Sequence, residues 1–266
     1  MSKFTVSKLA ALKAKGEKFG TITAYDATFS KLFDECGVPA LLIGDSLGMV
    51  VQGHSSTVPV TIEEMVYHTK CVARGATTTS LIIADMPFCT YATPEQALRN
   101  AALLMQAGAG CVKFEGGEWL CDTVRLLTEN GIPVCAHLGL TPQSFNVFGG
   151  YKIQGRTEDN AKYITDSTLA LEEAGAGMEV LECVPAKLAA DISKKTRMPI
   201  IGIGAGSGTD GQILVMHDAF GFFGRPPKFA RNFLKECGTG DVRDAVKLYL
   251  DEVKNGSFPS QAESFE

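Results

Sequence analysis

Acidic residues follow several short apolar runs in this sequence. Three of them occupy equivalent places at the ends of such runs: Asp45, Asp85 and Glu115. An apolar run too short for a helix that ends in a polar residue is typical of a buried parallel strand, which carries that residue to the rim of a sheet. Carboxylates are hard oxygen ligands that suit Mg²⁺ better than zinc, and a cluster of them repels itself without a cation. We therefore predict one shared divalent-metal site, although any single acid here could instead cap a helix or form a salt bridge.

Two further polar residues lie beside these acids. Lys113 alternates with Glu115, so both side chains should point into the same interior face of their strand. A lysine placed there must pair with a carboxylate or bind an anionic substrate, and the sequence leaves both interpretations open. Ser46 directly follows Asp45 and either donates to a substrate carboxylate or caps a helix.

A glutamate and a histidine at other strand exits are candidates for proton transfer. Glu182 stands in an otherwise apolar strand, away in sequence from the proposed ligand acids, and is the best candidate for a general base. His137 ends another strand, where it can serve as an acid, a hydrogen-bond donor, a ligand or simply a structural residue. The remaining histidines are weaker candidates. His68 lies inside a predicted helix and should be structural, whereas His54 lies in a long loop where it could contact substrate. Nothing in the surrounding sequence distinguishes His217.

The elements that must position these residues alternate between strand and helix about eight times, without a linker. Repeated right-handed crossovers close most simply into a single-domain (β/α)8 TIM barrel over residues 1–266, with its active site at the carboxyl ends of the strands. A short amphipathic helix should precede the barrel, and residues 227–253 should form a helical extension before a loose polar tail at about 255–266. An open doubly wound sheet is the competing fold, but it would gather ligands at one switch point rather than at nearly every strand exit.

Composition excludes several classes of protein. The 266 residues carry a formal charge of −5 and no basic cluster, which argues against a nucleic-acid partner. No apolar run approaches the roughly 20 residues that cross a bilayer, and the lysine-rich N-terminus lacks a secretory pattern. The 8 cysteines are scattered without a CxxC pair. This usage predicts a cytoplasmic protein with neither disulfides nor a zinc cage.

Longer motifs, in order along almost the whole chain, resemble the ketopantoate hydroxymethyltransferase family: GDSLGMVVQGH, YHTKCVARG, ADMPFCTYATPEQA, VKFEGGEW, PVCAHLGLTPQS, FGGYKIQGR, LECVP, IGIGAG and DGQILVMHDAFG. The resemblance implies a Mg²⁺-dependent barrel of the phosphoenolpyruvate/pyruvate superfamily, with one ion per subunit and usually a cytoplasmic homodecamer. It also implies transfer of a hydroxymethyl group from 5,10-methylenetetrahydrofolate to the keto acid 3-methyl-2-oxobutanoate. The products are 2-dehydropantoate, a pantothenate precursor, and tetrahydrofolate.

Carried over to this sequence, the family's motifs assign roles to individual residues. Asp45 and Asp85 are expected to bind Mg²⁺ directly and to contact the substrate, and Glu115 to bind the ion directly or through water. Ser46, Lys113 and His137 are expected at the keto acid, and Glu182 is expected to remove the proton from its C3 carbon. The sequence departs from the family pattern mainly in the N-terminal helix, at residues 224–227 and in the tail. Of these, Arg225, Pro226 and Pro227 are expected to affect a loop near the mouth of the site.

Two other functions remain compatible with the residues alone. One is a Mg²⁺-dependent carbon–carbon lyase of the same superfamily, which forms an enolate without folate. The other is a non-catalytic ligand-binding barrel, in which the strand-end acids are paired structurally. The set of Asp45, Asp85, Lys113, Glu115 and Glu182 argues against the second, and a divalent ion other than Mg²⁺ is also open.

Overall fold

The computed structural model describes residues 3–224 and 226–266, so the expectation for Arg225 lies outside the described residues. Eight parallel strands pair in sequence order and close into a barrel, as expected. They are β1 (Phe19–Thr23), β2 (Ala40–Ile43), β3 (Leu81–Asp85), β4 (Cys111–Glu115), β5 (Val134–Gly139), β6 (Met178–Glu182), β7 (Ile200–Ile203) and β8 (Gly211–Leu214). The (β/α)8 prediction is therefore confirmed, and the open sheet is wrong.

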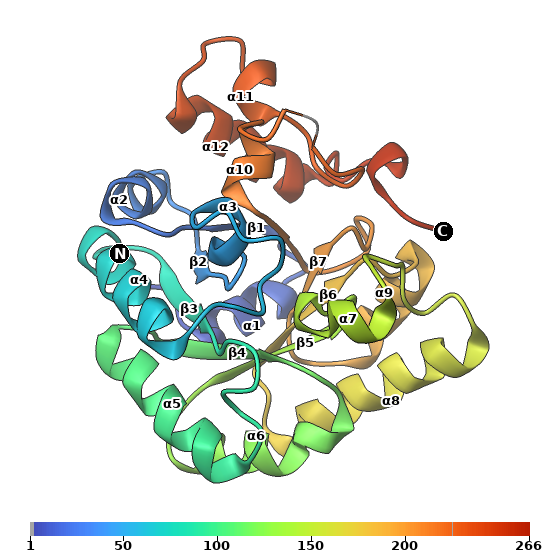
Figure 1. Cartoon of the computed structure of the whole chain (residues 1–266). Helices are drawn as coiled ribbons and strands as arrows, with labels where there is room; N and C mark the ends of the chain where they lie inside the picture. The colour runs from blue at the N-terminus through green and yellow to red at the C-terminus, as the bar shows by residue number, and fades with distance from the viewer. Residues whose placement is uncertain (1–2, 225) are drawn as a thin grey trace.

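Helices surround this barrel and extend beyond it (Figure 1). The α-helices are α1 (Val6–Ala14), α2 (Ala27–Glu35), α3 (Leu47–Val50), α4 (Ile62–Gly75), α5 (Pro94–Ala107), α6 (Cys121–Glu129), α7 (Phe145–Phe148), α8 (Glu158–Ala174), α9 (Ala186–Lys195), α10 (Met216–Ala219), α11 (Phe233–Glu236) and α12 (Val242–Asn255). Single 3-10 turns occur at η1 (Glu118–Leu120), η2 (Pro142–Ser144) and η3 (Gln261–Glu263). In the described ranges no helix has the length and apolar character needed to cross a membrane.

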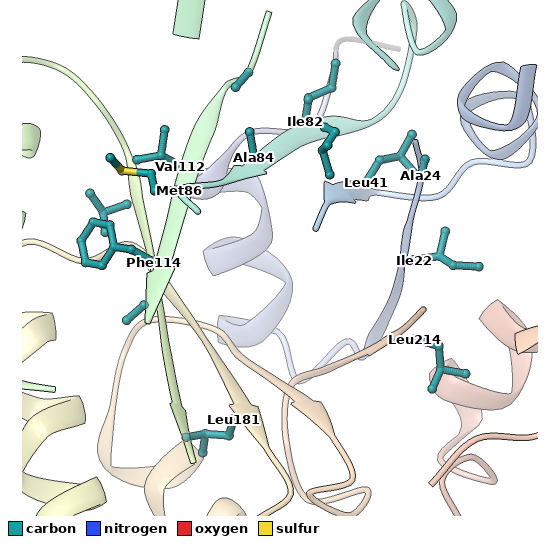
Figure 2. Packing of buried hydrophobic residues seen from close by; sticks show 14 of the residues in the cluster. Ile22, Ala24, Leu41, Ile82, Ala84, Met86, Val112, Phe114, Leu181 and Leu214 are labelled. Atoms are coloured by element: carbon teal, nitrogen blue, oxygen red, sulfur yellow. The ribbon is translucent and has the colours of Figure 1, made fainter. Parts of the chain in front are cut away.

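The strand alternation separates two hydrophobic cores. Side chains that face outward pack under the helices, and Figure 2 shows Ile22, Leu41, Ile82, Val112 and Leu181 among them. A second, smaller cluster fills the lower interior of the barrel, including Leu42, Ile83, Cys111, Val180 and Ile203. This part of the interior is therefore packed rather than hollow, and the charged side chains of the cavity gather near the strand exits.

The C-terminal extension differs from its prediction. Residues 227–253 are not continuously helical, because α11 and α12 are separated by a turn in which Gly238 and Gly240 have φ of 74° and 72°. Such positive φ values end a helix and favour glycine. The tail is also not loose. Glu263 forms an ion pair with Arg231 at 2.7 Å between Oε1 and Nε, and Phe265 accepts a backbone hydrogen bond from Ala186 N at 2.9 Å.

Phe258 anchors this tail in the core. Its side chain is 2% exposed and its ring centroid lies 5.2 Å from that of Phe233 and 5.8 Å from that of Tyr249. Deleting a buried aromatic ring removes its contacts and leaves a cavity, so Phe258→Ala should lower the free energy of unfolding by about 3–5 kcal/mol. Urea unfolding checks this value. A loss below about 1 kcal/mol would show that the tail is not held by this ring, and exposed Phe222→Ala is the control.

Candidate active site

Side-chain alternation directs the sequence-predicted polar residues into one cavity. Asp85 is in register with Lys113, Glu115 with His137, and Gly139 with Glu182 across adjacent strands. The cavity has a volume of about 720 Å³ at the carboxyl ends of the strands, and its lining includes all seven predicted residues: Asp45, Ser46, Asp85, Lys113, Glu115, His137 and Glu182. The structure therefore brings the whole set together.

The turn after β2 supplies two of these residues. Asp45 donates its backbone N–H to Asp85 Oδ2 at 3.0 Å, which ties the turn to β3. Ser46 precedes α3, but its hydroxyl makes no capping hydrogen bond and instead lies 2.9 Å from the hydroxyl of Tyr25. The helix-cap interpretation of Ser46 is therefore wrong. Gly44 leaves the room for this arrangement, because a Cβ atom there would stand 2.5 Å from Ser46 Oγ.

Lys113 is the cation of the cluster. Its Nζ lies 2.8 Å from Asp85 Oδ1 and 3.2 Å from His137 Nδ1, and its side chain is almost fully buried. Burial alone would lower the pKa of Lys113, but the carboxylates of Asp85, Glu115 and Asp45 together raise it. The lysine is therefore charged, and the ion pair that the sequence left open is present in this structure.

Glu115 is held by the loop that follows β5. Its Oε2 accepts the backbone N–H of Gln143 at 2.9 Å, and its Oε1 lies 3.3 Å from His137 Nδ1. The side chain of Gln143 donates to Asp45 Oδ2 at 2.8 Å and to the carbonyl of Met86 at 3.0 Å. One loop residue thus fixes two of the three proposed ligand acids.

The charge balance of this cluster calls for a further cation. Three buried carboxylates face one lysine, and burial and the neighbouring acids raise the pKa of Asp45 well above its usual range. Burial also raises the pKa of Glu115 to about 7. Glu115 Oε1 is buried and accepts no hydrogen bond, and Asp85 Oδ1 is buried with the Lys113 ion pair as its contact. Hard oxygen atoms with unused lone pairs fit Mg²⁺.

The donor set is open rather than closed around such an ion. Among residues 3–224 and 226–266, no group of three or more His, Cys, Asp and Glu side chains is arranged to hold a metal ion by itself. Mg²⁺ does not need such a group, because it is usually bound through one or two carboxylates while it keeps waters or substrate oxygens as its other ligands. Asp45 and Asp85 meet that requirement.

His137 connects the acidic cluster to Glu182. Its Nε2 lies 3.3 Å from Glu182 Oε2, on the opposite side of the ring from Lys113. Burial and the neighbouring Lys113 lower the pKa of His137, so the ring is neutral near pH 7. Because Nδ1 then accepts from Lys113, the proton resides on Nε2 and faces the carboxylate of Glu182. A neutral ring in this tautomer orients Glu182 without protonating it.

The three weaker histidines have different surroundings. His54 lines the cavity. His68 lies on α4, where its Nδ1 is 2.7 Å from the carbonyl of Tyr25, which confirms its structural role. His217 packs against the rings of Tyr25, Phe222 and Phe223. Only His54 among them is placed at the site.

Comparison with known proteins agrees with these motifs. The family model for ketopantoate hydroxymethyltransferase matches residues 3–261. The chain belongs to this family. The proteins named 3-methyl-2-oxobutanoate hydroxymethyltransferase from Colwellia psychrerythraea and Shewanella frigidimarina are 60% and 58% identical to it, each over the full length of both chains. The family is one of transferases, so the expectation of an enzyme is confirmed.

A distant solved structure shares the barrel fold. Phosphonopyruvate hydrolase in complex with oxalate and Mg²⁺ superposes with a TM-score of 0.61 at 13% identity, covering 98% of this chain and 93% of that one. At this identity the likeness concerns the fold alone.

Gln143 and Tyr91 are site residues that the sequence prediction missed. Gln143 is 5% exposed, and its amide oxygen accepts a hydrogen bond from the hydroxyl of Tyr91. The only sequence signal was a glutamine within the long Gly-rich loop that follows the His137 strand. Its role depends on how that loop folds back over β3 and β4, which spacing does not reveal.

This geometry predicts a measurable role for the Gln143 amide. Gln143→Ala leaves Asp45 Oδ2 without its donor, so Mg²⁺ affinity should fall by about 10- to 100-fold, as for other groups that orient metal ligands. Calorimetric titration with Mg²⁺ measures the change, with Gln96→Ala as a matched control on α5. Unchanged affinity in a folded variant would show that Gln143 does not orient the ligand acids.

Proposed function

We propose that this enzyme transfers a hydroxymethyl group from 5,10-methylenetetrahydrofolate to 3-methyl-2-oxobutanoate, giving 2-dehydropantoate and tetrahydrofolate for pantothenate synthesis. The names of the full-length relatives support the acceptor and the reaction class. The observation that carries the proposal is the position of Glu182, which faces the same cavity as the acid and lysine cluster and contacts it through His137.

Magnesium is the proposed metal, with one ion per subunit. Asp45 and Asp85 would hold it directly, and Glu115 would do so directly or through water. When bound, Mg²⁺ would polarise the ketone and carboxylate of the keto acid and so stabilise the enolate that forms from it. The buried Glu115 Oε1, which accepts no hydrogen bond, and the excess of buried carboxylates over lysine support this assignment.

The remaining polar residues would bind and deprotonate the keto acid. Lys113 is charged and buried, so it would attract the substrate's carboxylate and ketone oxygens, and the Ser46 hydroxyl, held by Tyr25, would donate to the same group. His137 would contribute its Nε2–H at the boundary between substrate and base. Glu182 would then take the C3 proton as a general base.

The enolate that results is the nucleophile for the one-carbon unit. Its C3 carbon would form a bond to the methylene carbon of the folate, whose bonds to the folate nitrogens break. Water would supply the hydroxyl group of the product, and its remaining proton, together with the proton that Glu182 took from C3, would go to the two folate nitrogens to give tetrahydrofolate. The cavity volume of about 720 Å³ is larger than a small keto acid fills. This extra space favours the binding of a second substrate in the same cavity.

Product formation tests the proposal against its alternatives. Purified enzyme, 3-methyl-2-oxobutanoate and Mg²⁺ should give 2-dehydropantoate only when methylenetetrahydrofolate is added, and EDTA should stop the reaction. Cleavage of an oxyacid without folate would indicate the lyase, and no effect of chelation would indicate a non-catalytic barrel.

A cytoplasmic homodecamer is the assembly that the family resemblance implies, and we propose it for this chain. Light scattering after size-exclusion chromatography tests the assembly. A mass near that of the 28.4 kDa subunit would contradict it.

A further inference from the structure

The outer part of the cavity has a composition unlike that of its acidic floor. Its lining includes three phenylalanines and two lysines from separate segments of the chain: Phe223, Phe229, Phe265, Lys152 and Lys228. We define these five residues as the mouth cluster. Phe223 is 53% exposed, and both lysines lie at the surface, so apolar rings and positive charge face solvent at the same opening.

The exit of β7 explains why two of these rings fit there. Gly204 follows this strand with φ of 61°, and a Cβ atom at this position would lie 3.0 Å from carbons of both Phe229 and Phe265. Most of the other strand exits present a polar side chain, whereas this one presents bare backbone against which two rings pack. Their centroids lie 6.5 Å apart at an interplanar angle of 71°.

The C-terminal tail is fixed in place as part of this wall. The carbonyl of Phe265 accepts the N–H of Ala186 at 2.9 Å, and that of Ser264 accepts from Lys228 Nζ at 2.7 Å. The same ammonium group lies 5.0 Å from the centroid of the Phe265 ring. In Figure 1 the red C-terminal end approaches the barrel beside α9, on the side where β6 and β7 end.

We propose that the mouth cluster binds the folate co-substrate, with the rings of Phe223, Phe229 and Phe265 contacting its pterin and benzoyl rings and Lys152 and Lys228 binding its glutamate carboxylates. This inference rests on the proposed function. Flat heteroaromatic rings stack on aromatic side chains, and ammonium groups at a rim attract carboxylates. The keto acid would occupy the floor of the cavity, whereas Lys152 and Lys228 lie at the surface. The rings of the folate would therefore point inward and its carboxylates outward.

The position of the Phe229 and Phe265 rings relative to Glu182 agrees with this orientation of the folate. Cys183 follows Glu182 and donates its backbone N–H to the carbonyl of Ile203, one residue before Gly204. The two rings therefore lie next to the strand that carries the proposed base. A pterin held there brings its one-carbon unit toward the C3 carbon of the keto acid, while its glutamate extends to solvent.

Two assays separate this subsite from the keto-acid site. Deuterium exchange at C3 of 3-methyl-2-oxobutanoate needs no folate and reports on the floor of the cavity. Equilibrium dialysis with tetrahydrofolate reports on the mouth. Phe265→Ala and Phe223→Ala should each weaken tetrahydrofolate binding about tenfold, as expected for loss of one stacking ring, while exchange changes less than about twofold. Phe265→Tyr should restore binding.

Matched variants exclude a general structural effect. Phe222→Ala removes an equally exposed ring that does not line the cavity, and it should leave tetrahydrofolate binding unchanged. Lys152→Met should weaken binding of tetrahydrofolate about threefold but not that of tetrahydropteroate, which lacks the glutamate. Lys187→Met, on the exposed face of α9, is the control for charge.

The outcomes distinguish this inference from the proposed function. If wild-type protein binds tetrahydrofolate and the three mouth variants bind it equally well, the subsite is wrong while the proposed function stands. If wild-type protein exchanges the C3 proton but binds no tetrahydrofolate, the co-substrate assignment fails and the subsite fails with it. Selective loss of folate binding in the mouth variants supports both.

Discussion

Glu182→Gln should abolish exchange of the C3 proton of 3-methyl-2-oxobutanoate with solvent deuterium. A general base contributes about 10²- to 10⁴-fold, and glutamine cannot accept the proton. The substitution keeps the shape of the side chain, and His137 still faces it across the 3.3 Å that separates Nε2 from Oε2 in the native protein. Binding of Mg²⁺ and of the keto acid should therefore persist. Nuclear magnetic resonance of the keto acid in deuterium oxide measures the exchange rate.

Glu179 provides the matched control for this variant. It lies on the same strand but points outward, where Thr168 donates to its Oε1 at 2.8 Å. Burial raises the pKa of Glu179 to about 8, so this side chain is protonated at pH 7 and glutamine resembles it closely. The Glu179→Gln variant should catalyse exchange of the C3 proton of 3-methyl-2-oxobutanoate at the rate of the native protein. Rapid exchange in Glu182→Gln would remove Glu182 from the role of base.

Asp45→Ala should weaken the binding of Mg²⁺ and of the keto acid together. The variant removes a carboxylate at the centre of the cluster and leaves the Gln143 amide without its acceptor. Losing one charged ligand costs about 3 kcal/mol, which corresponds to roughly a hundredfold in Kd. Because substrate oxygens would share the ion, keto-acid affinity should fall in parallel. Calorimetric titration with Mg²⁺, and then with the keto acid at fixed Mg²⁺, measures both.

Asp26 is a natural control for the role of Asp45. It also stands after a strand, but its carboxylate caps α2 by accepting from Thr28 N at 2.7 Å and Phe29 N at 3.0 Å. Asp26→Ala should therefore cost about 1 kcal/mol of stability and leave Mg²⁺ affinity unchanged. Equal Mg²⁺ affinity in Asp45→Ala and the native protein would contradict the ligand assignment.

These two aspartates show how far the sequence alone reaches. Strand exits and the inward direction of Lys113 and Glu115 follow from periodicity, because alternate side chains face opposite sides of a strand. The barrel follows from the repeated crossovers. Whether an acid after a strand caps the next helix or turns toward the axis depends on the turn itself. For Asp45, the 3.0 Å hydrogen bond from its backbone N–H to Asp85 Oδ2 fixes the turn against β3. No sequence pattern predicts that bond.

Long-range packing accounts for the parts that prediction missed. Gln143 reaches Asp45 only because its loop crosses the barrel mouth. The sequence of the tail is mostly polar, yet Phe258 fills a core position and Phe265 lies against Gly204. A few aromatic residues therefore order a segment whose average composition suggests a loose end.

Transfer of an isotopic label tests the central claim most directly. The enzyme is incubated with 3-methyl-2-oxobutanoate, Mg²⁺ and methylenetetrahydrofolate labelled with carbon-13 in its methylene group, and the products are identified by mass spectrometry and nuclear magnetic resonance. The label should appear in the hydroxymethyl group of 2-dehydropantoate, with one tetrahydrofolate formed for each molecule of product. Unlabelled product, or cleavage of the keto acid without transfer of the label, would contradict the proposed one-carbon transfer.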